Sequence, residues 1–303
     1  MKVYLGVPRG FCAGVVRAID IVELALKKYG SPIYVKHQIV HNPFVVASLE
    51  EKGVITVEDV QEIPHDATVV FSAHGSPPED FQLAEERNLN VIDATCPLVT
   101  RVHNEAKKYS NEGRKLVLVG HRGHQEVKGT MGQSDMFLVD DREPFQVPDW
   151  DSKTPISVIT QTTLSVEDTE RSINNIEREF SDVVVRNDLC YATTNRQMAV
   201  KKIASMCDMF FVIGSKNSSN SLRLVEVAKK SGCKKSELFN FTKDLPLDQI
   251  VNSKVIGLTS GASAPEKLIQ DFISEVGKHC DLSIEEVVTT KEKVVFKLPK
   301  ALN

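Results

Sequence analysis

"VIDATCPLVTRV", residues 91–102, joins an apolar strand to a helix through a turn that contains one cysteine, Cys96. Val91 and Ile92 are β-branched residues of the kind enriched in strands, and Pro97 is typical of the first position of a helix. No second cysteine follows at the short spacing of a Cys-x-x-Cys pair. A chemical role for this thiol would therefore need partners from elsewhere in the chain.

Two other stretches repeat this design, one on each side of Cys96. "VYLGVPRGFCAGVVRAID" presents Cys12, 84 residues earlier, and "VVVRNDLCYATTNRQMAV" presents Cys190, 94 residues later. Each cysteine follows an apolar strand and precedes a segment with helical periodicity. The three cysteines therefore occupy equivalent positions in a repeating pattern.

Two further strands follow each cysteine, and each ends in polar residues. The first set gives His41, His124 and Ser218, which lie 29, 28 and 28 residues after their cysteines. The second set gives His74, Thr162 and Ser263, at 62, 66 and 73 residues. The pattern predicts three copies of a three-strand α/β unit, with the polar residues at the carboxyl ends of parallel strands, where ligands bind.

Composition and charge limit the possible function classes. The chain has 303 residues, 41% hydrophobic and 26% charged, with a net charge of −4, so it offers no electrostatic signal for nucleic acid. No run approaches the roughly 18 apolar residues of a membrane span. Arg9 interrupts the N-terminal apolar run, so "MKVYLGVPRGFCAG" does not resemble a secretory signal. We expect a cytoplasmic protein with reduced thiols and no membrane or nucleic-acid partner.

Three cysteines at equivalent positions favour a soft metal centre. Buried packing is the commonest fate of a free cysteine, but it does not explain the repetition. Three thiolates suit zinc or an iron–sulfur cluster, and a [4Fe–4S] cluster with three cysteine ligands would leave one iron open as a Lewis acid. A redox sensor and a zinc-dependent phosphate-ester hydrolase remain as alternatives. We assign no chemistry to Cys207, at a helix–strand junction, or to Cys233 and Cys280, in polar turns.

The strand-end residues indicate what the centre would bind. "GSKNSSNS" and "SGASAPE" are Gly/Ser-rich turns that enter helices, and helix N-termini attract phosphate oxygens. Helix capping alone is the simpler reading of any one turn. A diphosphate site is predicted from the polar set His41, His74, Ser218, Ser219, Asn220 and Ser263. Glu126, two residues after His124, suits proton delivery if it is sheltered from water; the alternative is a solvated glutamate in the first turn of a helix.

Long motifs resemble the 4-hydroxy-3-methylbut-2-enyl diphosphate reductase (LytB) family. The matching segments are "GFCAGVVRAI", "HNPFVV", "SAHGSPPE", "DATCPLVTRVH", "GHRGHQEVKGTMGQ", "TQTTLSVEDT", "CYATTNRQ", "VGSKNSSNSLRL" and "SGASAPE", read with Ile213 in place of the leading Val of the eighth motif. They follow the family's order from residue 10 to residue 266. Gln38 and Gln125 depart from its usual residues, but neither is a ligand or the acid.

The resemblance implies an α/β trefoil of three pseudo-threefold-related modules around a central [4Fe–4S] cluster bound by Cys12, Cys96 and Cys190. We expect an N-terminal strand (1–13) that joins module three, module one (14–96), module two (97–190), module three (191–280), and a C-terminal tail (281–303) that packs across the modules.

The resemblance also implies an activity, the last step of the methylerythritol phosphate route to isoprenoids. The allylic hydroxyl of the substrate would be removed reductively to give isopentenyl and dimethylallyl diphosphates. The diphosphate-binding residues would be His41, His74, Ser218, Ser219, Asn220 and Ser263. Glu126 would be the proton donor, with His124 and Thr162 contacting the substrate. Reduced ferredoxin or flavodoxin would supply electrons, because the chain has no G-x-G-x-x-G nucleotide motif.

Overall fold

A computed structural model of the chain describes residues 1–240 and 245–302. The chain divides into two compact units. Unit 1 consists of Met1–Val15, His41–Val45 and Tyr191–Val295. Unit 2 consists of Val16–Val40, Val46–Cys190 and Phe296–Asn303. Within the described ranges, none of the helices combines the length and the apolarity that a membrane crossing requires.

Unit 2 contains two parallel four-stranded sheets with the same internal order. The first has the order β3-β2-β4-β5 and the second β7-β6-β8-β9. The elements that build the first module are α1 (Ala13–Tyr29), β2 (Ile33–Lys36), α2 (Pro43–Glu50), β3 (Val54–Val57), the 3-10 turn η1 (Val60–Glu62), β4 (Thr68–Phe71), α3 (Pro78–Glu86) and β5 (Asn90–Asp93). Those of the second are α4 (Pro97–Asn111), β6 (Lys115–Val119), α5 (Gln125–Met131), β7 (Met136–Val139), β8 (Ile156–Thr160), α6 (Val166–Glu179) and β9 (Val183–Val185).

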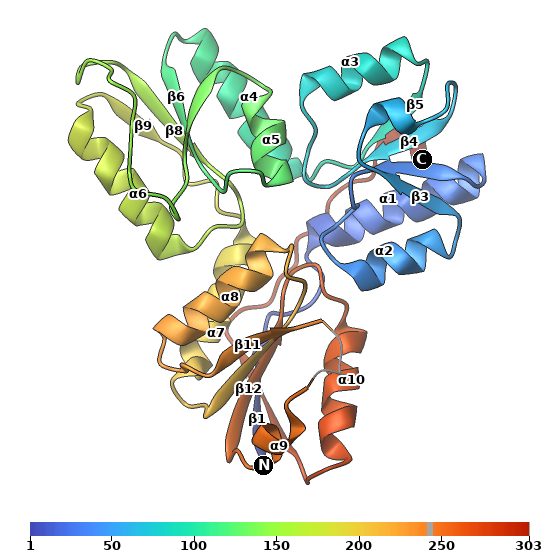
Figure 1. Cartoon of the computed structure of the whole chain (residues 1–303), viewed down its shortest axis with the longest axis vertical. Helices are drawn as coiled ribbons and strands as arrows, with labels where there is room; N and C mark the ends of the chain where they lie inside the picture. The colour runs from blue at the N-terminus through green and yellow to red at the C-terminus, as the bar shows by residue number, and fades with distance from the viewer. Residues whose placement is uncertain (241–244, 303) are drawn as a thin grey trace. The chain divides into compact units, whose positions relative to one another are not determined.

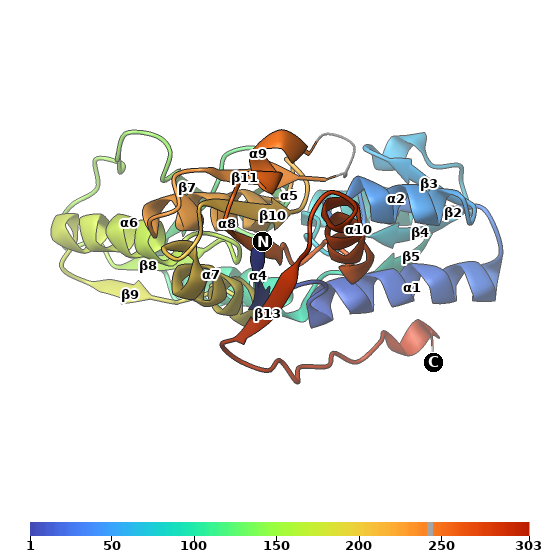
Figure 2. The ribbon, with the colours of Figure 1, turned by 90° about the horizontal axis from the view of Figure 1, so that it is seen from below.

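Unit 1 contains one parallel five-stranded sheet, with the order β11-β10-β12-β1-β13. Its elements are β1 (Lys2–Val7), α7 (Tyr191–Ala204), β10 (Met209–Ile213), α8 (Ser219–Lys230), β11 (Ser236–Phe239), α9 (Leu247–Val251), β12 (Val255–Ser260), α10 (Glu266–Gly277) and β13 (Ser283–Val288). The N-terminal strand thus lies between two strands from the C-terminal part of the chain. A last 3-10 turn, η3 (Lys300–Leu302), belongs to unit 2 and lies beside α1 (Figure 2), where Lys28 donates to the carbonyl of Ala301.

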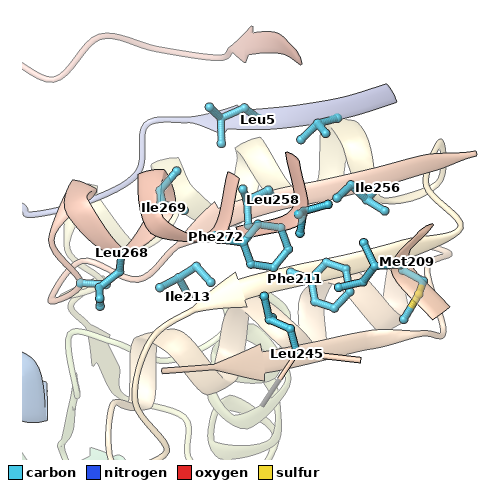
Figure 3. Close-up of a cluster of buried hydrophobic side chains, with 14 residues drawn as sticks. Leu5, Met209, Phe211, Ile213, Leu245, Ile256, Leu258, Leu268, Ile269 and Phe272 are labelled. Atoms are coloured by element: carbon cyan, nitrogen blue, oxygen red, sulfur yellow. The ribbon is translucent and has the colours of Figure 1, made fainter. Parts of the chain in front are cut away.

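Alternating side chains place a hydrophobic layer on each face of these sheets. On β6, Leu116 and Leu118 pack with α4, whereas Val117 and Val119 face α6. On the sheet of unit 1, α10 covers one face and α7 and α8 cover the other (Figure 1). Figure 3 shows the α10 side, where the rings of Phe211 and Phe272 lie 5.3 Å apart. Burial on both faces explains why these strands are continuous apolar runs.

The three sheets confirm the predicted repeat of α/β modules, with one difference. The strand before each cysteine, β5, β9 or β1, pairs with β4, β8 or β12, and that strand pairs with β2, β6 or β10. Each module has a fourth strand, β3, β7 or β11, that the three-strand prediction omits. These strands stand at the sheet edges, and β13 adds a fifth strand to the sheet of unit 1.

Candidate active site

Each of the three predicted ligands stands directly before a helix. Cys12 precedes α1, Cys96 is the N-cap of α4, and Cys190 precedes α7. The backbone N–H of each cysteine donates to the loop after the neighbouring strand: Cys12 to Ala262, Cys96 to Ala73 and Cys190 to Thr162, at 3.2, 3.0 and 3.0 Å. The three turns are therefore built alike, and each cysteine is bonded through its backbone to a loop that carries a predicted substrate-binding residue.

The donor set fits a thiolate-ligated metal centre. All six cysteines are thiols rather than disulfides, and Cys12, Cys96 and Cys190 are partly exposed. A helix N-terminus carries partial positive charge, which favours the thiolate form that metals bind. Thiolates are the ligands of iron–sulfur clusters, so the three turns have suitable chemistry for one.

Unit 1 forms a polar, acid-free helix N-terminus at α8. Ser218 caps the helix, and the hydroxyl of Ser221 donates to Ser218 Oγ at 3.0 Å. Asn220 is 5% exposed, and neither its Oδ1 nor its Nδ2 has a hydrogen-bond partner among the described residues. A buried amide without partners is costly unless a ligand satisfies it. Because the first turn of α8 contains no acidic residue, this end of the helix suits an anion.

The loop after β12 lies next to this helix end. A Cβ atom on Gly261 would come within 2.1 Å of Ser221 Oγ, so only glycine allows the approach. Ser263, two residues later, donates its hydroxyl hydrogen to the carbonyl of His41 at 3.2 Å. Within unit 1 these contacts bring together the loops that carry Cys12, His41, Ser218 and Ser263.

Unit 2 buries an acid at the equivalent helix N-terminus, that of α5. Glu126 is 4% exposed; its two carboxylate oxygens accept from the N–H of Thr162 at 2.6 Å and from its hydroxyl at 3.0 Å. Burial raises the pKa of Glu126 to about 7, although the two hydrogen bonds from Thr162 oppose the shift. The structure therefore excludes the solvated-glutamate alternative, and this carboxyl group can hold a proton near neutral pH.

His124 is oriented by the same helix. Its Nδ1 accepts from the N–H of Glu126 at 3.2 Å, which places the proton of a neutral ring on Nε2. The ring of His74 lies 6.1 Å from that of His124, measured between centroids. A Cβ on Gly129 would lie 2.7 Å from the carbonyl oxygen of Gly75, so glycine lets α5 approach the loop that carries His74.

One other group in unit 2 has metal-ligand composition. His121, Asp140 and Asp141 have ligand atoms within 4.8 Å of one another. However, Asp140 accepts two side-chain hydrogen bonds from Arg142, and His121 Nε2 lies 3.0 Å from Asp141. Burial acts to raise the pKa of Asp140, but hydrogen bonds from Arg142 and Arg122 outweigh it and hold the pKa well below its usual range. These ion pairs account for the group without a metal.

The remaining cysteines belong to the packing of unit 1. Cys207 contacts the α7–α8 core layer, and burial raises the pKa of its thiol to about 12. Cys233 lies in the turn between α8 and β11, as its sequence suggests, but its side chain is buried in the same layer, and Cys280 packs against the α10 layer.

The predicted site residues thus fall into two groups, and the structure brings each group together within its unit. Cys12, His41, Ser218, Ser219, Asn220 and Ser263 lie in unit 1, whereas Cys96, Cys190, His74, His124, Glu126 and Thr162 lie in unit 2. Fold and residues define a class: an α/β protein of three parallel-sheet modules with a thiol at an equivalent helix N-terminus in each. Unit 1 also has an acid-free helix N-terminus at α8, and unit 2 has a buried acid.

Comparisons with known proteins identify the family within this class. Residues 3–277 match the model of the LytB protein family. The 4-hydroxy-3-methylbut-2-enyl diphosphate reductase of Beijerinckia indica is 48% identical, over 100% of this chain and 97% of its own. That of Haemophilus influenzae (strain PittEE) is 47% identical, over 100% and 98%.

A solved structure is similar as well. The E-1-hydroxy-2-methyl-but-2-enyl-4-diphosphate reductase of Plasmodium falciparum has a TM-score of 0.91 and 35% identity, covering 99% of this chain and 96% of that one. The chain belongs to the LytB family of 4-hydroxy-3-methylbut-2-enyl diphosphate reductases. The predicted family, fold class of three α/β modules and enzyme class are therefore confirmed. Membership in this family also implies a [4Fe–4S] cluster.

Proposed function

We propose that this chain converts (E)-4-hydroxy-3-methylbut-2-enyl diphosphate into isopentenyl and dimethylallyl diphosphates, with Cys12, Cys96 and Cys190 as the three protein ligands of a [4Fe–4S] cluster. The observation that carries the proposal is the threefold recurrence of a thiol at a helix N-terminus, with its N–H bonded to a loop that carries a predicted substrate contact. Family membership supports the same reaction.

The cluster would pass on, one at a time, the two electrons from the external donor and would offer a Lewis acid at its open iron. The reaction consumes these two electrons and two protons, breaks the allylic C–O bond and releases the hydroxyl group as water. One proton goes to the departing hydroxyl, and the other goes to a terminus of the allylic unit. Protonation at either end of that unit accounts for two products.

The diphosphate would bind at a helix end that offers hydrogen-bond donors and contains no acidic side chain. Ser218, Ser219 and Asn220 stand at the N-terminus of α8, and the buried amide of Asn220 has both of its polar atoms available. His41, His74 and Ser263 would add further donors. Backbone N–H groups and the helix dipole favour the negative charge of the phosphate oxygens.

Glu126 would act as the proton donor. Its pKa of about 7 keeps a large fraction protonated at neutral pH, which is the condition for general acid catalysis there. Thr162, which bonds both carboxylate oxygens, would hold the carboxyl group in place and orient the substrate hydroxyl. His124, with its proton on Nε2, would donate a hydrogen bond to the substrate.

The electrons would come from reduced ferredoxin or flavodoxin. We place the enzyme in the cytoplasm, because an open iron–sulfur cluster and six cysteines that form no disulfide fit a reducing compartment.

Anaerobic purification followed by iron, sulfide and zinc analysis tests the proposal, using the wild type, Cys96→Ser and, as a control, Cys280→Ser. We expect about four irons per chain in the wild type and in Cys280→Ser, and a depleted cluster in Cys96→Ser. Addition of the hydroxylated diphosphate should change the iron spectrum of the wild type. Zinc as the main metal, or iron that does not depend on Cys96, would contradict the proposal and favour the hydrolase or the sensor.

A further inference from the structure

Each helix that follows a proposed ligand carries an arginine in its second turn. Arg17 on α1, Arg101 on α4 and Arg196 on α7 lie five, five and six residues after Cys12, Cys96 and Cys190. Each arginine bonds to the residue two positions before the next cysteine in the cyclic order of the modules. Each arginine and its partners belong to the same unit: unit 2 for Arg17 and Arg101, and unit 1 for Arg196.

Arg17 holds the turn of Cys96. Its Nη1 donates to the carbonyl oxygens of Ala94 and Thr95 at 3.2 and 3.0 Å, and its Nε donates to the carbonyl of Lys297 at 2.8 Å. Burial lowers the pKa of Arg17, and the negative charges of Asp93 and Cys96 oppose that shift. The hydrogen bond to the carbonyl of Thr95 places the guanidinium group next to the residue that precedes Cys96.

Arg196 holds the turn of Cys12. Its side chain is fully buried, and its Nη2 donates to the carbonyl oxygen of Gly10 at 2.8 Å. Its Nη1 pairs with Glu292 Oε1 at 3.0 Å, so a carboxylate compensates the buried charge.

Arg101 reaches the turn of Cys190 through a side chain. Its Nη2 lies 3.4 Å from Asp188 Oδ1, and Asp188 is 1% exposed. The other carboxylate oxygen of Asp188 accepts from the N–H of Thr160, at the end of β8, at 3.2 Å. Arg101 itself is about half exposed, so this contact is the weakest of the three.

Packing alone does not require this recurrence. A guanidinium group has five donors in a rigid fork, which suits it to gripping a carbonyl-rich turn. The residues bonded stand two positions before each cysteine, where a small backbone shift would redirect the thiol. Positive charge beside a cysteine turn also offsets the repulsion among thiolates and that of a reduced cluster.

We propose that Arg17, Arg101 and Arg196 are positioning residues of the metal centre, which hold the three cysteine turns in the ligating conformation, and that Arg17 also places positive charge next to the turn of Cys96. This inference rests on the proposed function, because it takes Cys12, Cys96 and Cys190 as the ligands. Arg17 is the most informative position, since its three hydrogen bonds go to neutral carbonyl oxygens rather than to a carboxylate.

The test compares holoenzymes purified anaerobically: the wild type, Arg17→Gln and Arg17→Lys. The readouts are the rate of iron loss to a chelator and the midpoint potential of the cluster. For Arg17→Gln we expect iron loss about tenfold faster, the lower end of the range for residues that orient metal ligands, and a more negative potential. Arg17→Lys should keep the potential of the wild type, because it keeps the charge, but lose iron at an intermediate rate.

Two controls separate positioning from general stability. Val22→Ala opens a cavity in the same helix without touching the turn, and should melt at a lower temperature with wild-type potential and slow iron loss. Arg178→Gln removes an exposed arginine from α6 and should change neither readout.

The inference would be overturned if Arg17→Gln lost iron at the wild-type rate and kept the wild-type potential. It would also be overturned if Val22→Ala lost iron as fast as Arg17→Gln, or if Arg17→Lys shifted the potential as much as Arg17→Gln. A wild type without an iron–sulfur cluster would instead refute the proposed function itself.

Discussion

The N-termini of α5 and α8 follow equivalent strands, β6 and β10, yet they carry opposite chemistry. The first turn of α5 contains a buried acid, Glu126, whereas the first turn of α8 contains serines and Asn220 and no acid. The helix dipole favours negative charge at each of these two N-termini. At α8 the proposed source of that charge is the substrate, whereas at α5 it is the protein's own carboxyl group, which burial keeps partly protonated. The repeat therefore supplies one backbone design at both positions. The side chains differ, so the proposed role of the α8 end is to bind the diphosphate and that of the α5 end is to transfer a proton.

The largest expected effect on activity comes from removing the acid at the N-terminus of α5. Glu126→Gln keeps the shape and the contacts to Thr162 but cannot deliver a proton, so kcat should fall by about 10²–10⁴-fold. The Michaelis constant should change little, because the diphosphate is bound elsewhere. Steady-state kinetics with a chemical reductant measure both, and a variant with near wild-type kcat would remove Glu126 from the proton-donor role.

The next largest effect comes from a substitution that gives the first turn of α8 an acid, as α5 has. Asn220→Asp places a carboxylate where the diphosphate is proposed to bind, and like charges should lower kcat/KM by roughly 10²-fold, mainly through KM. Asn174→Asp, an exposed site on α6, makes the same charge change away from the site and should have no effect. Equal kinetics in the two variants would place the diphosphate away from α8.

The pH dependence sharpens the distinction between the two helix ends. With the pKa of Glu126 at about 7, kcat should fall about tenfold per pH unit above pH 7, and this limb should be absent from the residual rate of Glu126→Gln.

The same group affects stability in the metal-free protein. Its folded pKa lies above the ordinary 4.5, so its contribution is fully present below pH 4.5 and is lost as the pH rises through 7. Chemical denaturation of the wild type and Glu126→Gln across pH 4–8 should show this difference; parallel curves would mean that the pKa is not raised.

The smallest expected effect concerns the cap of α8. Ser218→Ala removes the oxygen that accepts from Ser221, and should cost about 1 kcal/mol of unfolding free energy. Ser218→Thr should keep most of that stability. If Ser218→Ala also raises KM while Ser218→Thr does not, the hydroxyl serves both the helix and the diphosphate; unchanged KM in both would limit Ser218 to capping.

Much of the fold could be predicted, because the central strands are apolar β-branched runs and each ends in a short polar cluster. The edge strands were missed for physical reasons. β3, β7 and β11 are only four residues long, and β13, "SIEEVV", is largely exposed and contains two glutamates, so it lacks the signature of a buried strand. The signal for these strands is their pairing, which depends on residues far away in the chain.

The site divides in the same way. Cysteines and strand-end residues could be found from type and spacing, because parallel sheets bring strand ends to one edge. Arg17, Arg101 and Arg196 could not be found, since an arginine on a helix usually marks a solvated face. Their partners lie 77, 87 and 186 residues away. Their similar offset of five or six residues from the cysteines is the only indication of them in the sequence.

The position of β1 has a consequence for the order in which the molecule can be made. β1 leaves the ribosome before both of its sheet neighbours, because β12 and β13 begin about 250 and about 280 residues later in the chain. At synthesis rates of about 5–20 residues per second, this strand waits on the order of ten seconds to a minute for a partner. The sheets of unit 2 need nothing beyond residue 185, so the turns of Cys96 and Cys190 can form on the nascent chain. The loop after β12 that bonds Cys12 is synthesised after the turns of Cys96 and Cys190. The proposed metal centre, which needs all three thiols, would therefore be loaded only after this loop has left the ribosome.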